Sequence, residues 1–155
     1  ARNGYLGRVH TVWVSVPGGR SLPTLPVQSP PADLNYDLWV GPSPMRPYRE
    51  GLCTYNWYFV TDYCAGWIQS WGVHHLDIAL WGAPALAATK LEAEGTATFP
   101  EEGTGDASFA WKTRLVEPGG VALDFCSDGE GRHGRRVGAQ NARPQRDRGD
   151  EGQSP

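Results

Sequence analysis

The stretch "GWIQSWGVHHLDIALWG", residues Gly66–Gly82, decides the clearest structural element of this chain. Its apolar residues recur at spacings of three and four among polar ones, the pattern of an amphipathic helix. Gly82 and Pro84 then form a typical helix stop. The sequence therefore predicts a helix from about Gly66 or Trp67 to Trp81.

One face of this predicted helix carries polar residues. Residues three and four apart lie on the same side of a helix, so Ser70, His74, Asp77 and Trp81 form a stripe, while His75 points about 100° away. An imidazole beside a carboxylate is a common general acid–base pair. The alternative is a histidine that hydrogen-bonds locally in a packed helix. A metal site would need a third ligand, which the spacing of the other histidines does not supply.

Four further segments alternate or concentrate β-branched and apolar residues, which is typical of strands. They are separated by a proline-rich excursion, by the predicted helix and by "PEEGTGD" and "EPGG", which we interpret as hairpin turns. The sequence thus predicts an α+β domain with strands at about Val9–Val16, Ala87–Phe99, Ala107–Leu115 and Gly120–Ser127.

A long segment from Ser21 to Pro47 carries too many prolines for either regular element. It overlaps "LNYDLWVGPSPMRPY", Leu34–Tyr48, and five of the seven tryptophans lie between Trp39 and Trp81. Disordered segments are poor in aromatic residues, whereas long ordered loops often carry function. We therefore predict an ordered functional loop, in which the aromatic residues either stack on a ligand or pack in the core.

The composition changes abruptly near residue 130. The last part of the chain has many arginines, no aromatic residue and little to bury. We expect one domain over residues 1–129, followed by a tail over residues 130–155 that is either disordered or the product of a shifted reading frame. Cys53, Cys64 and Cys126 show no metal-binding spacing, so separate free thiols are favoured over a Cys53–Cys64 bridge.

Charge and motifs narrow the function. A net charge of −3 and a pI near 5.8 give no basic field for nucleic acid. No apolar stretch is long enough to span a membrane and no signal peptide is visible, so we expect a soluble cytoplasmic or periplasmic protein without a membrane partner. The glycines match no phosphate-binding fingerprint, so no cofactor-binding residues are predicted, and no metal site either.

Two quoted segments carry a family resemblance. "LNYDLWVGPSPMRPY", followed by "WYFVTDYCAGWIQSWGVHHLDIALWG", resembles the Gfo/Idh/MocA oxidoreductases in the form abundant in planctomycetes. The first segment matches a D-x-W-x-G-P-x-P-x-x-P-Y loop and the second a W-G-x-H-H-x-D helix. The resemblance extends over roughly Arg2 to Gly129, and the loop positions that carry it are Asp37, Trp39, Gly41, Pro42, Pro44, Pro47 and Tyr48.

The resemblance implies a particular architecture. Members of this family join an N-terminal Rossmann domain, which holds NAD or NADP, to a C-terminal α/β domain with an open, mainly antiparallel sheet and a helix packed on one face. Only the second part is recognisable, so we expect a truncated chain that binds no nucleotide and turns over no substrate alone. The implied partners are a sugar, polyol or related small molecule and further copies of the chain, which would assemble through the sheet.

The resemblance also assigns site residues. His74 matches the catalytic histidine that assists proton transfer, and Asp77 matches the acid three residues later. Ser70 stands where the family usually has an aspartate, and a hydroxyl cannot act as a base at neutral pH. We also expect four residues to bind substrate: Tyr48, Tyr63, Ser70 and Lys112. Tyr48, Tyr63 and Lys112 are placed in the pocket by neighbourhood rather than by a firm motif match.

Two alternative functions stay open. The first is that of family members that cleave glycosidic bonds with a transiently reduced NAD. The second is a non-catalytic domain that binds carbohydrate or builds an oligomer.

Overall fold

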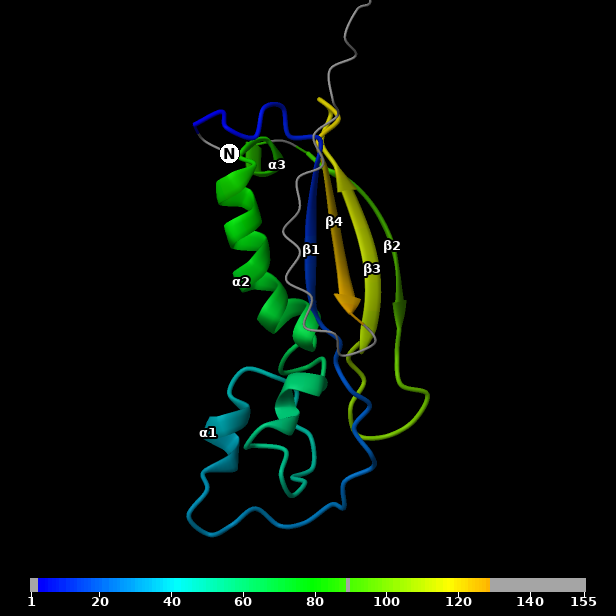
Figure 1. The fold of residues 1–155 in the computed structure, drawn as a ribbon. Coiled ribbons are helices and arrows are strands. Elements are labelled where there is room, and N and C mark those ends of the chain that lie inside the picture. The colour runs from blue at the N-terminus through cyan, green and yellow to red at the C-terminus, as the bar shows by residue number, and fades with distance from the viewer. Residues whose placement is uncertain (1–2, 89, 129–155) are drawn as a thin grey trace, which may run out of the picture.

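The computed structural model describes residues 3–88 and 90–128. Figure 1 shows a sheet with one long helix on one face and an irregular lobe beyond the beginning of that helix. We call the irregular part, residues 18–66, the loop lobe. The elements in chain order are β1 (Thr11–Pro17), α1 (Tyr36–Val40), the 3₁₀ helix η1 (Asn56–Phe59), α2 (Trp67–Gly82), α3 (Ala85–Ala88), β2 (Glu92–Thr98), β3 (Ala110–Val116) and β4 (Ala122–Asp128).

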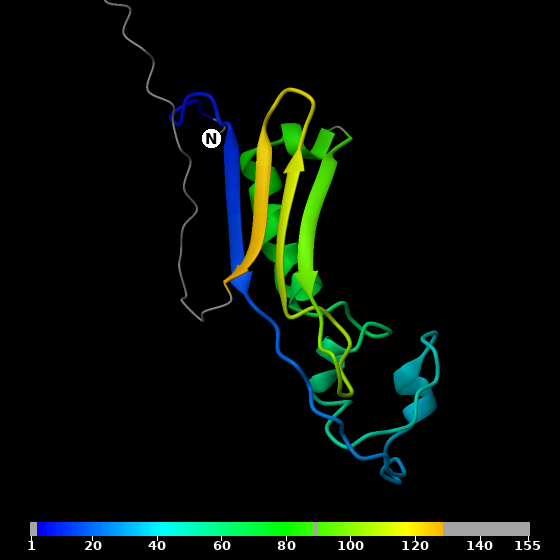
Figure 2. The ribbon, with the colours of Figure 1, turned by 90° about the vertical axis from the view of Figure 1, so that its right-hand side faces the viewer.

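The four strands form one open sheet in the order β1-β4-β3-β2 (Figure 2). β2 pairs with β3, and β3 with β4, in antiparallel fashion, whereas β1 pairs with β4 in parallel from Thr11↔Ala122 to Pro17↔Asp128. The predicted class is therefore confirmed: an α+β domain with an open, mainly antiparallel sheet and a helix on one face.

Helix α2 packs on one face of the sheet, against β1, and a glycine determines how close the helix lies to the sheet. Val14, Val16, Leu123 and Phe125 point from β1 and β4 into a core. Helix α2 completes this core with Ala79, which is buried, and with larger, partly buried residues. A Cβ at Gly72 would lie 2.9 Å from the Phe125 ring, so only glycine fits there without a shift. Glycine inside a helix is normally unfavourable by about 1 kcal/mol, and close packing is the reason to keep it here.

The strand and helix predictions hold with shifted ends. The long helix runs from Trp67 to Gly82, as the apolar spacing and the following Pro84 indicate. The strand expected over Ala87–Phe99 is wrong at its start, because the short helix α3 occupies Ala85–Ala88 and β2 begins at Glu92. Proline starts a helical turn well, alanine favours it, and Leu86, 2% exposed, anchors this turn in the core.

The expectation of no regular element over Ser21–Pro47 is also wrong, because α1 forms one helical turn inside it. The turn falls in a stretch without proline. The Asn35 side chain accepts a hydrogen bond from the Leu38 N–H at 3.0 Å, and Gly41 ends the turn with φ 58°.

The two predicted hairpin connections differ. "EPGG" forms a tight turn between β3 and β4, in which the Glu117 carboxylate accepts hydrogen bonds from the N–H groups of Gly119 and Val121. "PEEGTGD" instead belongs to a longer connection, residues 99–109, that leaves the sheet and contacts the loop lobe. The Thr104 N–H donates to the Leu22 carbonyl at 3.1 Å, and the Asp106 N–H to the Phe59 carbonyl at 3.0 Å.

Three other expectations concern the cysteines, the membrane and the C-terminal tail. The three cysteines are free thiols, so no Cys53–Cys64 bridge forms. In the part of the chain that the structure describes, no helix is long and apolar enough to cross a membrane. The predicted tail, residues 130–155, lies outside the described residues, and the domain boundary at 129 stays a prediction.

The fit at Gly72 predicts opposite effects for two substitutions in the same helix. Gly72→Ala should lower the free energy of unfolding by about 1–3 kcal/mol, because the added methyl group overpacks against Phe125. Gly82→Ala is the matched control, since a Cβ there meets nothing within 4 Å, and it should be neutral or stabilise by up to about 1 kcal/mol. Denaturant unfolding of both variants gives the comparison, and an equal gain in both would contradict the packing described.

Candidate functional site

The outward face of α2 is the candidate site. Gly72 and Ala79 are the buried residues of this helix and mark its sheet-facing side. Two residues advance a helix by about 200°, so His74 points away from the sheet. His74 and Asp77 are exposed and Ser70 is half-buried, so the predicted stripe lies together on the outward face.

Large apolar side chains surround this polar stripe. Trp71 is 46% exposed, Ile78 62% and Trp81 62%. They lie three, four and seven residues from His74, spacings that place them on adjoining rows of the same face. An exposed face that joins aromatic and aliphatic groups to a histidine is typical of a binding surface.

His74 and Asp77 are not locked together. Among the described residues no hydrogen bond or ion pair joins the two side chains, although they are three residues apart on one face. The imidazole of His74 is therefore available to a bound molecule. The catalytic roles assigned to His74 and Asp77 stay predictions.

His75 differs from its neighbour in a way that the helix geometry predicts. Its Nδ1 lies 2.9 Å from the Trp71 carbonyl oxygen, one turn earlier. A carbonyl oxygen only accepts hydrogen bonds, so Nδ1 carries the proton. The ring also lies beside the Trp71 indole, with 6.1 Å between ring centroids. His75 is thus engaged locally, within its own helix.

Tyr48 and Tyr63 lie in an aromatic cluster of the loop lobe. Tyr36 stacks on Trp39 with ring centroids 5.7 Å apart and meets Tyr48 edge-on at 5.3 Å, while Trp39 meets Tyr63 at 4.9 Å. The Tyr36 hydroxyl donates to the Arg46 carbonyl at 3.0 Å. Burial, together with Tyr63 and other neighbours, raises the pKa of Tyr36 well above its usual value. The Tyr63 hydroxyl is itself buried. The role of Tyr48 and Tyr63 in substrate binding stays a prediction.

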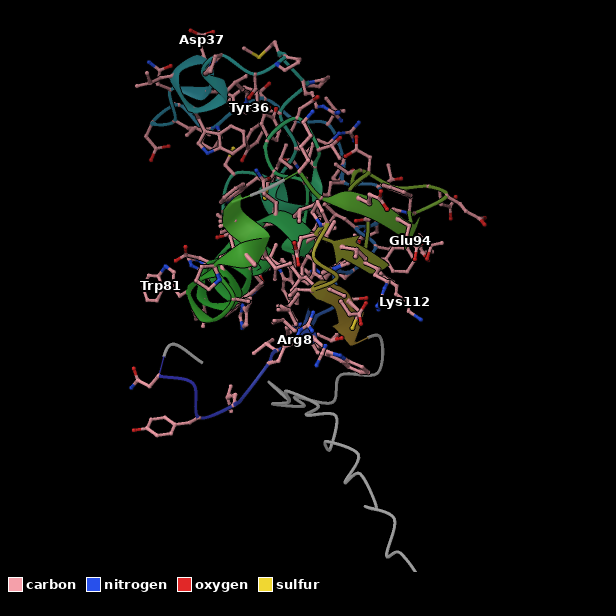
Figure 3. The ribbon with its side chains drawn as sticks, turned by 90° about the horizontal axis from the view of Figure 1, so that it is seen from above. Arg8, Tyr36, Asp37, Trp81, Glu94 and Lys112 are labelled. Carbon is pink, nitrogen blue, oxygen red and sulfur yellow. The ribbon has the colours of Figure 1, made fainter. Side chains whose placement is uncertain are left out.

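Lys112 lies apart from the other candidates. It alternates along β3 with Trp111, which packs into the core under α2, so Lys112 points to the opposite face of the sheet. Figure 3 shows Lys112 and Trp81 on opposite sides of the molecule. The structure therefore brings Ser70, His74 and Asp77 together and does not place Lys112 beside them.

An ion-pair network that the sequence did not suggest holds the loop lobe in place. Arg46 forms an ion pair with Asp62 and a second with Asp106, 3.2 Å from its Nη2. Asp106 also accepts a hydrogen bond from the Thr61 N–H at 2.6 Å. Arg46 sits inside the quoted loop motif, but its partners are 16 and 60 residues away in the chain, so no local signal could reveal them.

The described residues offer no metal centre, since no group of three or more His, Cys, Asp or Glu side chains is placed to hold an ion. They also contain no strand that leads through a glycine-rich turn into a helix, the arrangement that binds a dinucleotide.

Comparison with known proteins adds one family. A profile of the Gfo/Idh/MocA oxidoreductase family, described as its C-terminal alpha/beta domain, matches residues 10–93, more than half of the chain. This range ends inside β2 and includes the whole of α2. No curated protein matches the sequence.

One solved structure is similar, an NAD-binding protein from Listeria innocua, with 14% sequence identity and a TM-score of 0.43. The match covers 83% of this chain and 27% of that protein. The present chain thus spans well under half of the length of that structure.

The Asp106 network predicts acid sensitivity of the fold. Burial raises the pKa of the Asp106 carboxyl, but the hydrogen bonds from Thr61 and the charge of Arg46 outweigh it, so the pKa lies below its ordinary value. Such a group stabilises the folded state above its unfolded pKa, near 4, and loses that effect as the pH falls through its folded pKa.

Asp106→Asn should therefore lower the free energy of unfolding at pH 7 by up to about 1 kcal/mol, a small effect because the side chain is partly exposed. The difference from the parent chain should shrink between about pH 4 and pH 2. Chemical unfolding at several pH values measures it, with the exposed Glu102→Gln as control. A difference that does not change with pH would rule out the ionic contribution.

Proposed function

Because the chain belongs to the Gfo/Idh/MocA oxidoreductase family, whose C-terminal α/β domain it contains, we propose that it is the substrate-binding part of an NAD(P)-dependent oxidoreductase. The proposed substrates are sugars, polyols or related carbohydrates. The observation that carries the proposal is the outward face of α2, where His74 and Asp77 stand exposed among large apolar side chains.

The exposed apolar residues support a two-domain arrangement of the parent protein. Trp71, Ile78 and Trp81 would be an unusual set of surface residues on an isolated helix, and a nucleotide-binding domain packed over α2 would cover them. In that arrangement the substrate lies between the two domains, the common position for small-molecule sites. His74 would then face both the substrate and the nucleotide.

The chain's own part in the reaction is proton transfer and binding. The nicotinamide of the parent supplies the hydride acceptor. His74, whose ring makes no hydrogen bond or ion pair in the described residues, would take the proton from the substrate hydroxyl as the carbonyl forms. Asp77, one turn further on the same face, would favour the protonated imidazole. Ser70 can donate or accept a hydrogen bond to a sugar hydroxyl but cannot replace a carboxylate as base.

We propose two kinds of partner, a carbohydrate and further copies of the chain. A carbohydrate is suited by aromatic faces beside polar groups, which Trp71 and Trp81 provide next to His74. Assembly with further copies would use the sheet, whose face away from α2 is not covered by any helix in the described residues (Figures 1 and 2).

The two histidines give a matched test in a full-length parent that carries both domains. His74→Ala should lower kcat/KM for polyol oxidation by about 10²–10⁴-fold, the usual effect of losing a general base. His75→Ala should change it little, because His75 is engaged with the Trp71 carbonyl. NAD(P)H absorbance measures both, and full activity of His74→Ala would make His74 structural and favour the non-catalytic alternative.

The cofactor balance separates the remaining alternative. A dehydrogenase forms NAD(P)H in proportion to product, whereas a glycosidase that uses NAD transiently releases sugar without net reduction. The chain alone should form no NAD(P)H with any polyol, and detectable formation would contradict the assignment of nucleotide binding to another domain.

A further inference from the structure

Arg46 joins three segments of the chain that meet before α2. Its guanidinium pairs with Asp62, which lies five residues before the helix, and with Asp106, 3.2 Å away, in the connection between β2 and β3. The Asp106 carboxylate also accepts a hydrogen bond from the Thr61 N–H at 2.6 Å. The proton transfer proposed for the outward face of α2 involves none of these side chains.

The loop motif, residues 34–48, is tied to the segment before α2 by other contacts as well. The Ser43 hydroxyl donates a hydrogen bond to the Asp62 carbonyl oxygen at 3.1 Å, beside the carboxylate that pairs with Arg46. The Tyr36 hydroxyl donates to the Arg46 carbonyl oxygen at 3.0 Å, which fixes the backbone from which the guanidinium extends. The arginine is therefore held at both ends.

The segment that carries Asp106 also packs on the residue that begins α2. The N–H groups of Asp106 and Ala107 donate to the Phe59 carbonyl oxygen at 3.0 and 3.1 Å. A Cβ at Gly66, which precedes the helix, would lie 3.1 Å from the Ala107 Cβ, so the two backbones approach closely. The Gly66 carbonyl oxygen in turn accepts the hydrogen bond from the Ser70 N–H at 3.1 Å. The contacts of Arg46 thus continue to the first turn of the helix that carries the candidate site.

The loop motif lies on the side of the sheet that α2 covers. Trp39 of the motif meets Tyr63, four residues before the helix, with ring centroids 4.9 Å apart. Figures 1 and 3 place α1 and its residue Tyr36 toward the side on which Trp81 lies, away from Lys112. The motif is therefore on the same side of the domain as the outward face of α2.

We infer that Arg46 is a positioning residue for the substrate: through Asp62 and Asp106 it holds the loop motif at the start of α2, so that the site at His74 is ordered before substrate binds. A loop that is already ordered loses less conformational entropy on binding, and a site only partly in its competent form binds more weakly in proportion. Loss of the Arg46 ion pairs should therefore weaken substrate binding more than it slows the chemical step. This inference rests on the proposed function.

A second ion pair of similar exposure provides a matched control. Arg114 pairs with Asp124 at 2.7 and 2.9 Å, on the face of the sheet away from α2. Its side chain is 45% exposed, against 35% for Arg46. Ion pairs this exposed contribute little to overall stability, so either arginine can be replaced at a similar small loss. Of the two, only Arg46 contacts the loop motif.

The experiment measures kcat and KM for polyol oxidation in a full-length parent that carries both domains. Arg46→Met removes the charge and keeps an unbranched stem, and it should raise KM by about three- to tenfold while kcat changes by less than about twofold. Arg46→Lys keeps the charge and should recover part of the affinity. Asp106→Asn keeps an acceptor for the Thr61 N–H but loses the ion pair, so it should shift KM in the same direction. Arg114→Met should leave both constants unchanged.

Amide hydrogen exchange in the present chain tests the positioning without any activity. Arg46→Met should speed exchange at residues 36–48 and 60–70 and leave the four strands as in the parent chain, because the contacts that it removes lie only between those segments. Arg114→Met should not speed exchange in either segment. Circular dichroism checks that each variant is folded.

The outcomes are distinct. A rise in KM in the Arg46 and Asp106 variants, with faster exchange in the loop motif, supports the inference. An unchanged KM in Arg46→Met overturns it, and so does an equal rise in Arg114→Met, which would make both ion pairs merely structural. A parent that oxidises no polyol contradicts the proposed function instead. The exchange experiment then decides the positioning by itself, since faster exchange supports it and unchanged exchange overturns it.

Discussion

The contact between Gly72 and Phe125 is the constraint on which the arrangement of this domain depends. Helix α2 can lie close to the sheet only because no side chain separates its backbone from the Phe125 ring. The contact fixes the rotation of the helix about its axis, and with it the direction of every other side chain. Once Gly72 faces the sheet, His74 must face outward and His75 must turn toward Trp71. The catalytic histidine of the proposal is therefore positioned by a residue that takes no part in chemistry.

The loop lobe depends on the sheet in a different way. Its backbone is tied to residues 99–109 by hydrogen bonds from Thr104 and Asp106, and its side chains by Arg46. The connection between β2 and β3 therefore links the sheet to the loop lobe, two parts of the chain that are far apart in sequence. The lobe sits next to the beginning of α2, where Ser70 is found (Figure 1). A substitution that breaks these hydrogen bonds or ion pairs would therefore move the aromatic cluster relative to the outward face of α2.

The local features of this fold could be predicted from the sequence, and the long-range ones could not. The apolar spacing in Trp67–Gly82 and the alternation in "VHTVWVSV" reflect periodicity, which a single sequence displays directly. The parallel pairing of β1 with β4 joins segments at opposite ends of the domain, and no local pattern specifies it. The same applies to Arg46 and its partners. The turn α1 was missed because the prolines on both sides concealed a short stretch that favours a helix.

The candidate site also combines features that the local sequence predicts with features that only the tertiary structure shows. The outward position of His74 and the local bond of His75 both follow from helix geometry, whereas the position of Lys112 depends on which face of β3 is covered. Lys112 was expected in the pocket without a firm motif match of its own. Strand alternation and the packing of Trp111 under α2 decide against that proximity.

The parallel pairing of β1 with β4 also has a consequence for how the chain acquires its structure. The two strands are about 110 residues apart, and closing so long a segment of chain is entropically costly, which slows folding. During synthesis β1 emerges early and has no neighbour in the sheet until β4 has left the ribosome. The antiparallel β2–β3–β4 meander can form first by local contacts, and β1 would then dock last, together with the core residues Val14 and Val16. Of the four described strands, β1 is made first and would thus enter the sheet last.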